Sequence, residues 1–583
     1  SAAAEAATGI STPWSGVMYV KVYVDVAVYF GFVLALIGVG VVGGAVPAVR
    51  ALLHRRLPFV TFPASLVDYN PWPHGVSVGE AGLTAAVTAL YGWWGWWWTV
   101  GFNFQNGHYS TVDPHYPRQV VARGLGHLTT LTMSFLLFPV ARGSVWEAVF
   151  GIPFERALTY HRLLGRLCWV LVTAHMVTWQ IKWALEGTLW TNIVATTSLA
   201  TSPTDLHDNF TIPLAEAAWL VLTVVVGFAA FARRTRYALF QYTHHAVWFF
   251  FLAALVHAWS HWYYVAGGLL LYALDKLSRM VRASRAVTVL HLGHAAGVTL
   301  LEVDADALGA AGHAPGQYAF LNLPALAPLQ WHPFTISSPP AARCEGEAVA
   351  TFHIRDMGAG TWTRALADLA REGRHPADLT VSVDGPYGSP SRYYERDTVV
   401  LVAGGIGVTP IHAILADLYA RATAPSPAGR LGAVRHVHLL WVNRHPAFFH
   451  IMADTLAAIL AHNPGDMFSL HLHATGAARG GDGDGDDPAA ARFCAPASVA
   501  PVDAAVVHGR PNLEVFFAHI AAAAVASGKG TGAGGGAAAT GLPPPPLFDR
   551  VSVFVCGPTQ LVDDVSRLAF SHKFDFHTEV FHL

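Results

Sequence analysis

Charged residues are scarce in this chain. Asp, Glu, Lys and Arg together make up 13% of the 583 residues, whereas hydrophobic residues make up 53%. So small a charged fraction is typical of a protein that lies at least partly in a membrane. The formal net charge of −2 at pH 7 also lacks the basic excess that favours nucleic-acid binding, so we expect no nucleic-acid partner.

Cysteine is scarce as well. The chain has four cysteines, at positions 168, 344, 494 and 556, and none of them stands in C-x-x-C spacing. This pattern excludes a disulfide framework and a zinc site built on thiolates. Histidine, in contrast, is abundant, with 31 residues, and this excess needs an explanation.

Long apolar runs fill the first half of the chain. A helix needs about 20 residues to cross the roughly 30 Å of hydrocarbon in a bilayer. The sequence predicts seven such spans, at 18–45, 80–102, 119–140, 160–183, 212–231, 241–260 and 262–281. Basic residues gather in the loops that seven spans place on one side, which is the cytosolic side by the positive-inside rule. We therefore expect the N-terminus outside and the second half of the chain in the cytosol.

The second half has the pattern of a soluble α/β protein, with short alternating strands, Gly and Pro turns and amphipathic helices. We expect a membrane domain over 1–281, a β-rich domain over 282–395 and an α/β domain over 396–583. Two tracts rich in Gly and Ala, near 476–491 and 526–546, cannot form a core, and we expect them to be disordered insertions.

Several histidines fall inside the apolar spans, where an ionisable ring is costly and usually functional. His161 and His175 lie in the fourth span, fourteen residues apart. On an α-helix this separation is about 21 Å along the axis and keeps the two rings within roughly 40° of one face. The sixth span runs in the same direction and offers His244, His245 and His257 at matching depths. Two ligand pairs about 20 Å apart suit two stacked haems, one near each leaflet, rather than one metal ion.

The sixth span does not fit this scheme as a regular helix. His244 and His257 are thirteen residues apart, which places their rings about 140° apart on an ideal helix, and His245 is about 120° from His257. Either the helix is locally distorted or one haem is approached from another side. His127, in the third span, has no matching partner, and we interpret it as structural.

Four features of the second half suggest nucleotide chemistry. "HPFTISS" (332–338) offers hydroxyl and backbone groups to a flavin, and Arg355 precedes a Gly-rich helix start that suits a pyrophosphate. "VVLVAGGIGVTPIHAIL" (399–415) reads as a buried strand, a glycine turn and a helix, which lets the backbone approach a phosphate. Arg444 ends a strand where it could meet a 2′-phosphate, which favours NADPH over NADH.

Three stretches of the apolar half show a resemblance to a known family. "YHRLLGRLCWVLVTAH" (160–175), "YTHHAVWFFFLAALVH" (242–257) and "LLFPVARGS" (136–144) resemble the ferric reductase/NADPH oxidase superfamily, and most closely its plant-type ferric-chelate reductases. The resemblance implies a six-helix haem-binding core, here with one extra span. A ferredoxin-reductase-like module follows, with an antiparallel β-barrel FAD domain and an α/β Rossmann-like NADPH domain. It also implies a bis-histidine haem pair with spacings of 14 and 13, which favours His244 over His245.

The resemblance further implies the residues of each site. The haem ligands are His161, His175, His244 and His257. The flavin residues are His332, Pro333, Phe334 and Thr335, with Arg355, Trp362 and Thr363 at the diphosphate. The NADPH residues are Gly404, Gly405, Gly407, Thr409, Arg444, Gly557 and Pro558. Three residues are expected at the reacting groups: Cys556 near the nicotinamide, Phe581 stacked on the flavin, and Arg123 near the outer haem. Arg123 would bind a haem propionate or an anionic chelate, unless it contacts lipid headgroups.

The resulting hypothesis is an electron path across the membrane. Cytosolic NADPH would reduce FAD, and electrons would pass through two b-type haems to an external ferric chelate. Iron is favoured by the short segment before the first span and by Trp179, one turn beyond His175, where animal oxidases have another His. Reduction of oxygen to superoxide is the main alternative, and a non-enzymatic cytochrome-like partner subunit is a lesser one. We expect membrane lipid as a partner and the plasma membrane as the location, and the oligomeric state stays open.

Overall fold

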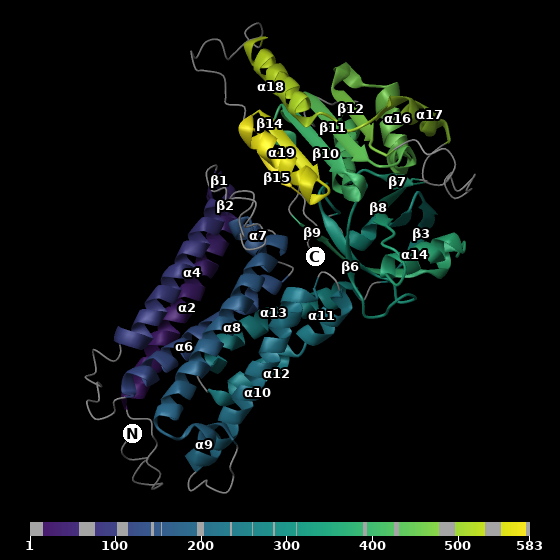
Figure 1. The fold of residues 1–583 in the computed structure, drawn as a ribbon. Helices are drawn as coiled ribbons and strands as arrows, with labels where there is room; N and C mark the ends of the chain where they lie inside the picture. Colours follow the sequence, from purple (N-terminus) through teal and green to yellow (C-terminus); the bar gives the residue numbers. More distant parts are fainter. Residues whose placement is uncertain are drawn as a thin grey trace. The chain divides into compact units, whose positions relative to one another are not determined.

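The computed structural model describes fifteen stretches of the chain, and every structural statement below concerns these residues. They are 16–57, 76–101, 115–141, 145–152, 154–194, 203–233, 236–258, 261–283, 286–309, 312–344, 346–388, 393–424, 431–476, 496–530 and 550–578. The chain divides into two compact units, Ser1–Leu277 and Ser278–Leu583, each with its own interior. Both are drawn in Figure 1.

The first unit is almost entirely helical (Figure 1). Its longer helices are α2 (Gly16–Ala45), α4 (Val78–Trp96), α6 (Tyr116–Leu136), α8 (Phe154–Leu185), α10 (Pro203–Phe231), α11 (Tyr237–His244), α12 (Val247–His257) and α13 (His261–Ala283). Shorter elements are α3 (Pro47–His54), α7 (Val145–Phe150), α9 (Leu189–Ile193), a π-helix (Trp97–Gly101), a 3-10 turn (Phe138–Val140) and the strand pair β1 (Arg56–Leu57) and β2 (Val76–Ser77).

Every predicted span contains helix in the structure. Four stretches are long and apolar enough to cross a membrane, namely Val26–Ala45, Tyr116–Val140, Phe210–Phe231 and Leu239–His257. The spans predicted at 80–102, 160–183 and 262–281 are helical as well, but they are not among these four stretches. The protein is therefore a membrane protein, and the seven-span topology remains a prediction.

An aromatic cluster joins the N-terminal helix α2 to the rest of this bundle. Tyr29 is 1% exposed, and its ring meets that of Tyr264 on α13 edge-on at 5.2 Å. The Tyr29 hydroxyl also forms a hydrogen bond with Ser134 on α6. Trp94 on α4 is fully buried against the same Tyr264 ring, at 5.5 Å. Buried aromatic contacts of this kind hold helices together in a membrane, where burial from water contributes little.

The second unit begins with an antiparallel seven-stranded sheet in the order β6-β5-β9-β3-β4-β8-β7. Its strands are β3 (Ala286–Ala295), β4 (Val298–Asp304), β5 (Tyr318–Asn322), β6 (His332–Thr335), β7 (Arg343–Cys344), β8 (Glu347–Arg355) and β9 (Thr380–Tyr387). One helix, α14 (Trp362–Arg371), packs Leu366 into the fully buried core beside Leu301 and Phe352. This antiparallel sheet lies where the sequence predicts a β-rich domain.

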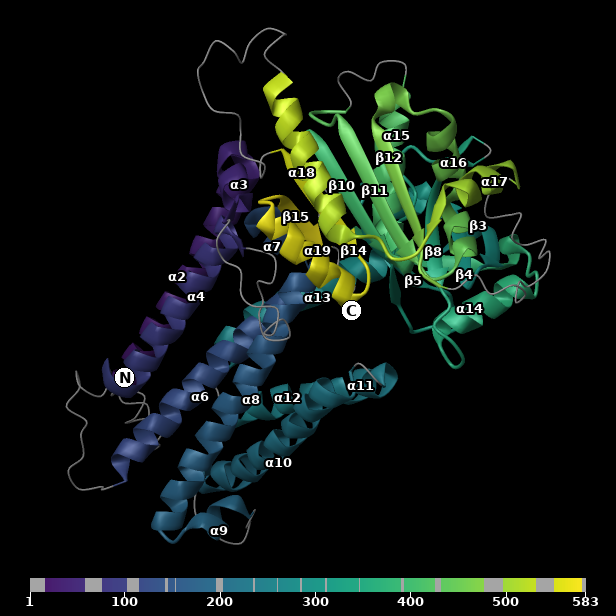
Figure 2. The same cartoon turned by 45° about the horizontal axis from the view of Figure 1, so that its top comes forward.

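A parallel six-stranded sheet follows, in the order β13-β12-β11-β10-β14-β15. Its strands are β10 (Thr398–Gly404), β11 (His436–Asn443), β12 (Phe468–Ala474), β13 (Val506–His508), β14 (Val551–Cys556) and β15 (Asp575–Thr578). Helices α15 (Val408–Ala422) and α16 (Ala453–Ala461) cover one face, and α18 (Leu513–Gly530) and α19 (Thr559–Ser571) cover the other (Figure 2). Because both faces are covered, the strands read as continuous apolar runs.

The strand order reverses beside β10. The chain leaves β10 for β11 on one side and returns later to β14 on the other, with Ala403 opposite Cys556 at the carboxyl ends. In open parallel sheets a ligand binds at such a switch point. The predicted fold class is confirmed. Both expected insertions lie outside the described residues, except Gly476 and the C-terminal end of α18.

Candidate redox centre

Four histidines of the helical unit form two facing pairs. The rings of His161 and His244 have centroids 6.1 Å apart and cross at 76°. Those of His175 and His257 have centroids 6.4 Å apart and cross at 82°. Two imidazoles that bind one metal ion from opposite sides, each through a bond of about 2 Å, have centroids roughly 6 Å apart. Each pair therefore has the spacing of two imidazoles that could bind one metal ion between them, and these are the pairs expected from the sequence.

Hydrogen bonds to helix α6 orient the two rings of α8. Nδ1 of His161 donates to the carbonyl of Leu136 at 3.0 Å, and Nδ1 of His175 donates to the carbonyl of Ala122 at 2.6 Å. A ring that donates from Nδ1 keeps the lone pair of Nε2 for a metal. The two histidines and the two carbonyls are each fourteen residues apart, so one antiparallel register of α6 against α8 sets both bonds.

Each carbonyl is accessible for a local reason. Leu136 is the last residue of α6, where helix carbonyls lack intrahelical partners. Ala122 lies inside the helix, one turn before Gly126, and a Cβ on Gly126 would come within 3.0 Å of the His175 ring. The missing side chain of Gly126 thus lets the His175 ring reach the helix backbone.

The sixth span is broken into two helices between His244 and Val247, which explains the thirteen-residue spacing. Four hydrogen bonds around the break join residues three apart, at 3.0 to 3.3 Å: His245 to Tyr242, Ala246 to Thr243, Trp248 to His245 and Phe249 to Ala246. Such a 3-10 turn rotates about 120° per residue instead of about 100°. The extra rotation brings His244 towards the side of His257. Of the two alternatives left open by the sequence, the structure shows the local distortion of the helix.

His245 takes no part in either pair. Its Nδ1 donates to the carbonyl of Gln241 at 2.7 Å, one turn earlier, and the side chain is exposed. Nδ1 of His244, in contrast, is buried and has no hydrogen-bond partner among the described residues. In the structure it is thus His244, and not His245, whose ring faces His161.

Three further residues of the helical unit were singled out in the sequence. His127 stacks on Trp98 with centroids 3.3 Å apart, which agrees with a structural role. Arg123 follows Ala122 on α6 and its side chain is exposed, and its contact with a propionate or chelate stays a prediction. Trp179 stacks on Trp183 at 5.6 Å, on α8 beyond His175.

The expected flavin residues gather around β6 and the start of α14. His332, Pro333, Phe334 and Thr335 form β6, which pairs with β5. Trp362 stacks on Phe334, with ring centroids 5.6 Å apart, and its ring also contacts the tilted ring of His332 at 4.7 Å. Burial lowers the pKa of His332, so its ring is neutral near pH 7. Trp362 is only 9% exposed, so it supports the motif from the barrel core.

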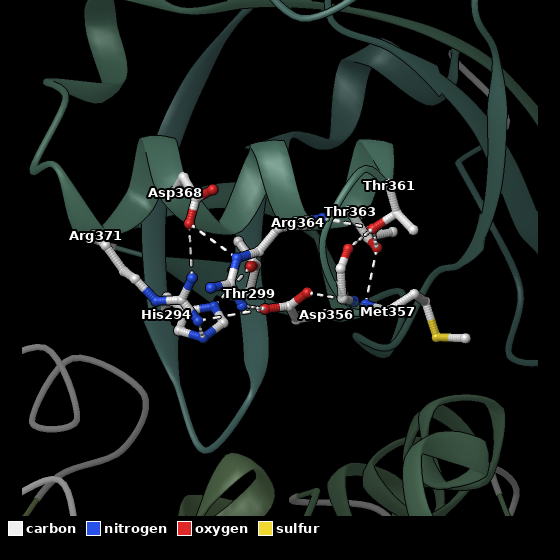
Figure 3. A network of polar contacts seen from close by, with 10 residues as sticks. His294, Thr299, Asp356, Met357, Thr361, Thr363, Arg364, Asp368 and Arg371 are labelled. Atoms are coloured by element: carbon white, nitrogen blue, oxygen red, sulfur yellow. Dashed lines mark hydrogen bonds and ion pairs between the residues drawn. The ribbon is translucent and has the colours of Figure 1, made fainter.

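The loop before α14 is held by a polar network that sequence reasoning missed (Figure 3). Asp356 accepts from the amide of Gly358 at 2.9 Å and from Arg364 at 2.8 Å, and Arg371 lies 3.4 Å away. Burial acts to raise the pKa of Asp356, but the Gly358 amide and the two guanidiniums overcome it, so this pKa lies below its ordinary value. In the sequence, the only sign of this network is that Asp356 follows Arg355 and that Arg364 and Arg371 come later, in the helix.

The same loop fixes the expected diphosphate residues. The Thr363 hydroxyl accepts from the amide of Met357 at 3.0 Å, and the Thr361 hydroxyl caps α14 by accepting from the amide of Arg364 at 3.1 Å. Arg355 ends β8 with an exposed side chain. A capped helix N-terminus with a nearby arginine is a suitable place for a pyrophosphate.

The nucleotide motif lies where β10 passes into α15. Gly404, Gly405 and Gly407 form the turn, and the Thr409 hydroxyl donates to the carbonyl of Ile406 at 3.2 Å. A Cβ on Gly407 would overlap the carbonyl of Cys556 and lie 3.0 Å from the amide nitrogen of Gly557. This glycine therefore allows the turns after β10 and β14 to touch, in addition to any contact with a phosphate.

The remaining nucleotide residues lie at the carboxyl ends of two strands. Cys556 is buried at the end of β14, and Gly557 and Pro558 follow it. Arg444 follows β11, and its side chain is exposed. Phe581 lies outside the described residues.

Family comparisons cover most of the chain. Residues 125–267 match a family described as "Ferric reductase like transmembrane component". Residues 307–391 match "FAD-binding domain", and residues 396–570 match "Ferric reductase NAD binding domain".

Curated relatives include both reductases and oxidases. Ferric reduction oxidase 7, chloroplastic, of Arabidopsis thaliana is 29% identical over 393 residues, which are 63% of this chain and 49% of the relative. Respiratory burst oxidase homolog protein B of the same plant is 27% identical over 405 residues, which are 60% of this chain and 44% of the relative. The chain thus spans about half the length of these relatives.

A solved structure, the cytochrome b5 reductase domain of Ulva prolifera nitrate reductase, is 14% identical and covers 51% of this chain and 97% of its own, with a TM-score of 0.31. The three family matches follow one another in one chain, across the helical unit, the antiparallel sheet and the parallel sheet. The protein belongs to the ferric reductase/NADPH oxidase superfamily.

Proposed function

We propose that this protein is a transmembrane ferric-chelate reductase that takes electrons from cytosolic NADPH. FAD, when bound, accepts two electrons from the nicotinamide and releases them singly to haem. The observation that carries the proposal is the pairing of His161 with His244 and of His175 with His257, at 6.1 and 6.4 Å. Among the described residues no group of three or more His, Cys, Asp or Glu could hold a metal ion, so haem suits these pairs better than a bare metal.

The chain's own residues would hold the haem irons and set their properties. An iron held by two histidines would have no position left for an acceptor, which would therefore be reduced at the edge of the outer haem. The carbonyls of Leu136 and Ala122 keep Nε2 of His161 and His175 available for iron. Arg123, beside Ala122, would meet a propionate or the anionic chelate.

In the second unit, β6 and the loop before α14 would hold FAD, with Arg355 and Thr363 at the diphosphate. The β10 turn would take the NADPH phosphates and Arg444 the 2′-phosphate. Cys556 ends β14 beside the switch point, where the nicotinamide would lie, and Phe581 would cover the flavin. Cys556 is buried, so it would shape this place rather than react with solvent.

Oxygen is the second candidate acceptor, because relatives named as oxidases match nearly as well. The heavy chain of a superoxide-generating NADPH oxidase of Dictyostelium discoideum is 26% identical over 396 residues, which are 61% of this chain and 73% of the relative. Trp179, in place of the extra His expected of animal oxidases, supports iron. We propose the plasma membrane with the N-terminus outside, although relatives carry chloroplastic and mitochondrial names.

The acceptor is tested with the purified full chain loaded with haem and FAD. NADPH-driven reduction of an Fe(III) chelate is measured without oxygen, and superoxide is then measured in air without iron. We expect fast iron reduction and little superoxide. Strong superoxide with negligible anaerobic iron reduction would reverse the choice. A protein that binds haem, but whose flavin does not bleach with NADPH, would be a cytochrome-like partner subunit instead.

A further inference from the structure

Two partly buried histidines, neither of them among the site residues named above, join the two halves of the second unit. His412 lies on α15, in the parallel-sheet half. Its Nδ1 donates to the carbonyl of Ser337 at 2.8 Å, and its Nε2 lies 2.8 Å from the hydroxyl of Thr455 on α16. The carbonyl belongs to the antiparallel half, so the ring connects the two.

His353 makes the reciprocal connection. It lies on β8 of the antiparallel half, and its Nδ1 is 2.7 Å from the hydroxyl of Ser337. The ring also forms a backbone hydrogen bond to Ile451, in the parallel half. Ser337 is therefore held on both sides, and its own amide donates to the carbonyl of Thr351 at 2.8 Å. We call this set, His353, Ser337 and His412 with Thr455 and Ile451, the histidine bridge.

Both rings are neutral. Burial, and the neighbouring His412, lower the pKa of His353 to about 3, and burial lowers the pKa of His412. A neutral His412 that donates from Nδ1 must accept at Nε2, so the Thr455 hydroxyl donates to it. Each hydrogen bond of His412 thus has one defined donor and one defined acceptor. A flip of the imidazole ring would break both bonds.

The bridge joins segments that belong to the two cofactor motifs. Ser337 comes two residues after Thr335, the last residue of β6. His412 comes five residues after Gly407, in the helix that starts at the nucleotide turn. A bond between Ser337 and His412 therefore links the strand that would hold the flavin to the helix that would hold the nucleotide.

We propose that His412 and His353 are positioning residues that set the nicotinamide against the flavin. The inference rests on the proposed NADPH and FAD chemistry. In that step a hydride, two electrons and one proton, leaves the dihydronicotinamide, which is oxidised, and passes to the flavin, which is reduced. Its rate depends steeply on the approach of the two rings, and a displacement of about 1 Å can cost about 100-fold.

The test uses two amide variants of His412 in the full chain loaded with haem and FAD. Asn places its donor near the position of Nδ1 and can keep the Ser337 bond, whereas Gln places its amide near Nε2 and can keep only the Thr455 bond. We expect anaerobic flavin bleaching by NADPH to slow about 100-fold in His412→Gln and less than fivefold in His412→Asn. The exposed His462, changed to Asn, is the matched control and should leave the rate unchanged.

Two further measurements separate positioning from general damage. NADP⁺ affinity should change less than threefold in His412→Gln, and hydrogen exchange of the FAD-free protein should rise at 446–455 and at 335–338 only. Thr455→Val removes the hydroxyl while keeping nearly the same shape, and it should also slow flavin bleaching. This variant replaces His412→Gln in the test if His412→Gln does not fold. Equal rates in His412→Gln, His412→Asn and wild type would overturn the inference. A wild-type flavin that NADPH does not bleach would overturn the proposed function instead.

Discussion

Nδ1 of His175 donates a hydrogen bond of 2.6 Å to the backbone carbonyl of Ala122, on the neighbouring helix α6. The same ring faces His257 at 6.4 Å on its other side. One side of the imidazole is therefore fixed by α6, and the other faces the place where an iron would lie. This arrangement fixes the ring before any haem is bound, which is the role of a hydrogen-bonded partner to a metal ligand.

Replacing His175 by Leu should remove one haem and leave the other. Leu has no nitrogen to bind iron, whereas His161 and His244 are untouched. We expect haem content to fall from about two per chain to about one, with the loss of one of two low-spin signals in electron paramagnetic resonance. His127→Leu, in the same unit, should keep both haems. Two intact signals in His175→Leu would exclude His175 as a ligand.

Adding one methyl group at Gly126 should disturb the same haem without removing a ligand. The new Cβ would come within 3.0 Å of the His175 ring, so the ring must turn or move away from Ala122. We expect a changed low-spin signal and a shifted reduction potential for one haem only. Gly95→Ala is the control, because its Cβ would meet Leu128 at an ordinary 3.7 Å. If Gly126→Ala and Gly95→Ala leave both potentials equally unchanged, the packing of His175 on α6 does not tune the haem.

The histidine pairs could be predicted because they depend on periodicity within single helices. His161 and His175 lie on one face of a regular helix. Because the fourth and sixth spans run in the same direction, His244 and His257 were expected at the same depths in the membrane. The distortion that rotates His244 showed in the sequence only as a spacing that does not fit a regular helix, because residues 242–249 contain no Gly or Pro to mark a break. Its form, a short run of bonds between residues three apart, depends on packing of the whole bundle.

The missed residues depend on contacts between distant parts of the chain. His412 and Ser337 are 75 positions apart, and neither stands in a pattern that indicates its partner. Likewise Asp356 reads as a loop aspartate until the fold of α14 brings Arg371 to it. Trp362 was expected at the diphosphate, but its place in the barrel core follows from the stacking of three rings that only the folded sheet brings together.

Changing Asp356 to Asn should weaken FAD binding. The amide keeps an acceptor for Gly358 but loses the charge that holds Arg364 and Arg371, so the loop before α14 loosens. We expect FAD affinity to fall about tenfold, measured by flavin titration of the FAD-free full chain.

Asp368→Asn is a matched control, because Asp368 meets the same two arginines at 3.2 and 2.9 Å but is half exposed and does not touch the loop. Its FAD affinity should stay within threefold of wild type. An equal loss in both variants would mean that the charge of the arginines, not the loop, governs flavin binding.

Gly407→Ala should impair the nucleotide step and spare the rest. A Cβ at this position would overlap the carbonyl of Cys556, so the turns after β10 and β14 must move apart. We expect the KM for NADPH to rise at least tenfold, on the rough scale of a displaced binding turn. Haem content and FAD content, read from the absorbance spectrum, serve as the folding controls. An unchanged KM with normal spectra would show that the two turns need not touch for nucleotide binding.

The second unit should lose stability as the pH falls from about 6.5 towards 4. Burial, and the neighbouring His471, His436 and His519, lower the pKa of His438 to about 4. Its unfolded pKa is about 6.5, so between these values the unfolded chain binds more protons and stability drops by at most about 1.4 kcal/mol per pH unit. The temperature at which the full chain releases fluorescent FAD should therefore fall between pH 7 and pH 5. His438→Leu should flatten this dependence, whereas His462→Leu, at an exposed position, should not. A release temperature that rises with acidity, or the same dependence on pH in His438→Leu and His462→Leu, would contradict a neutral His438.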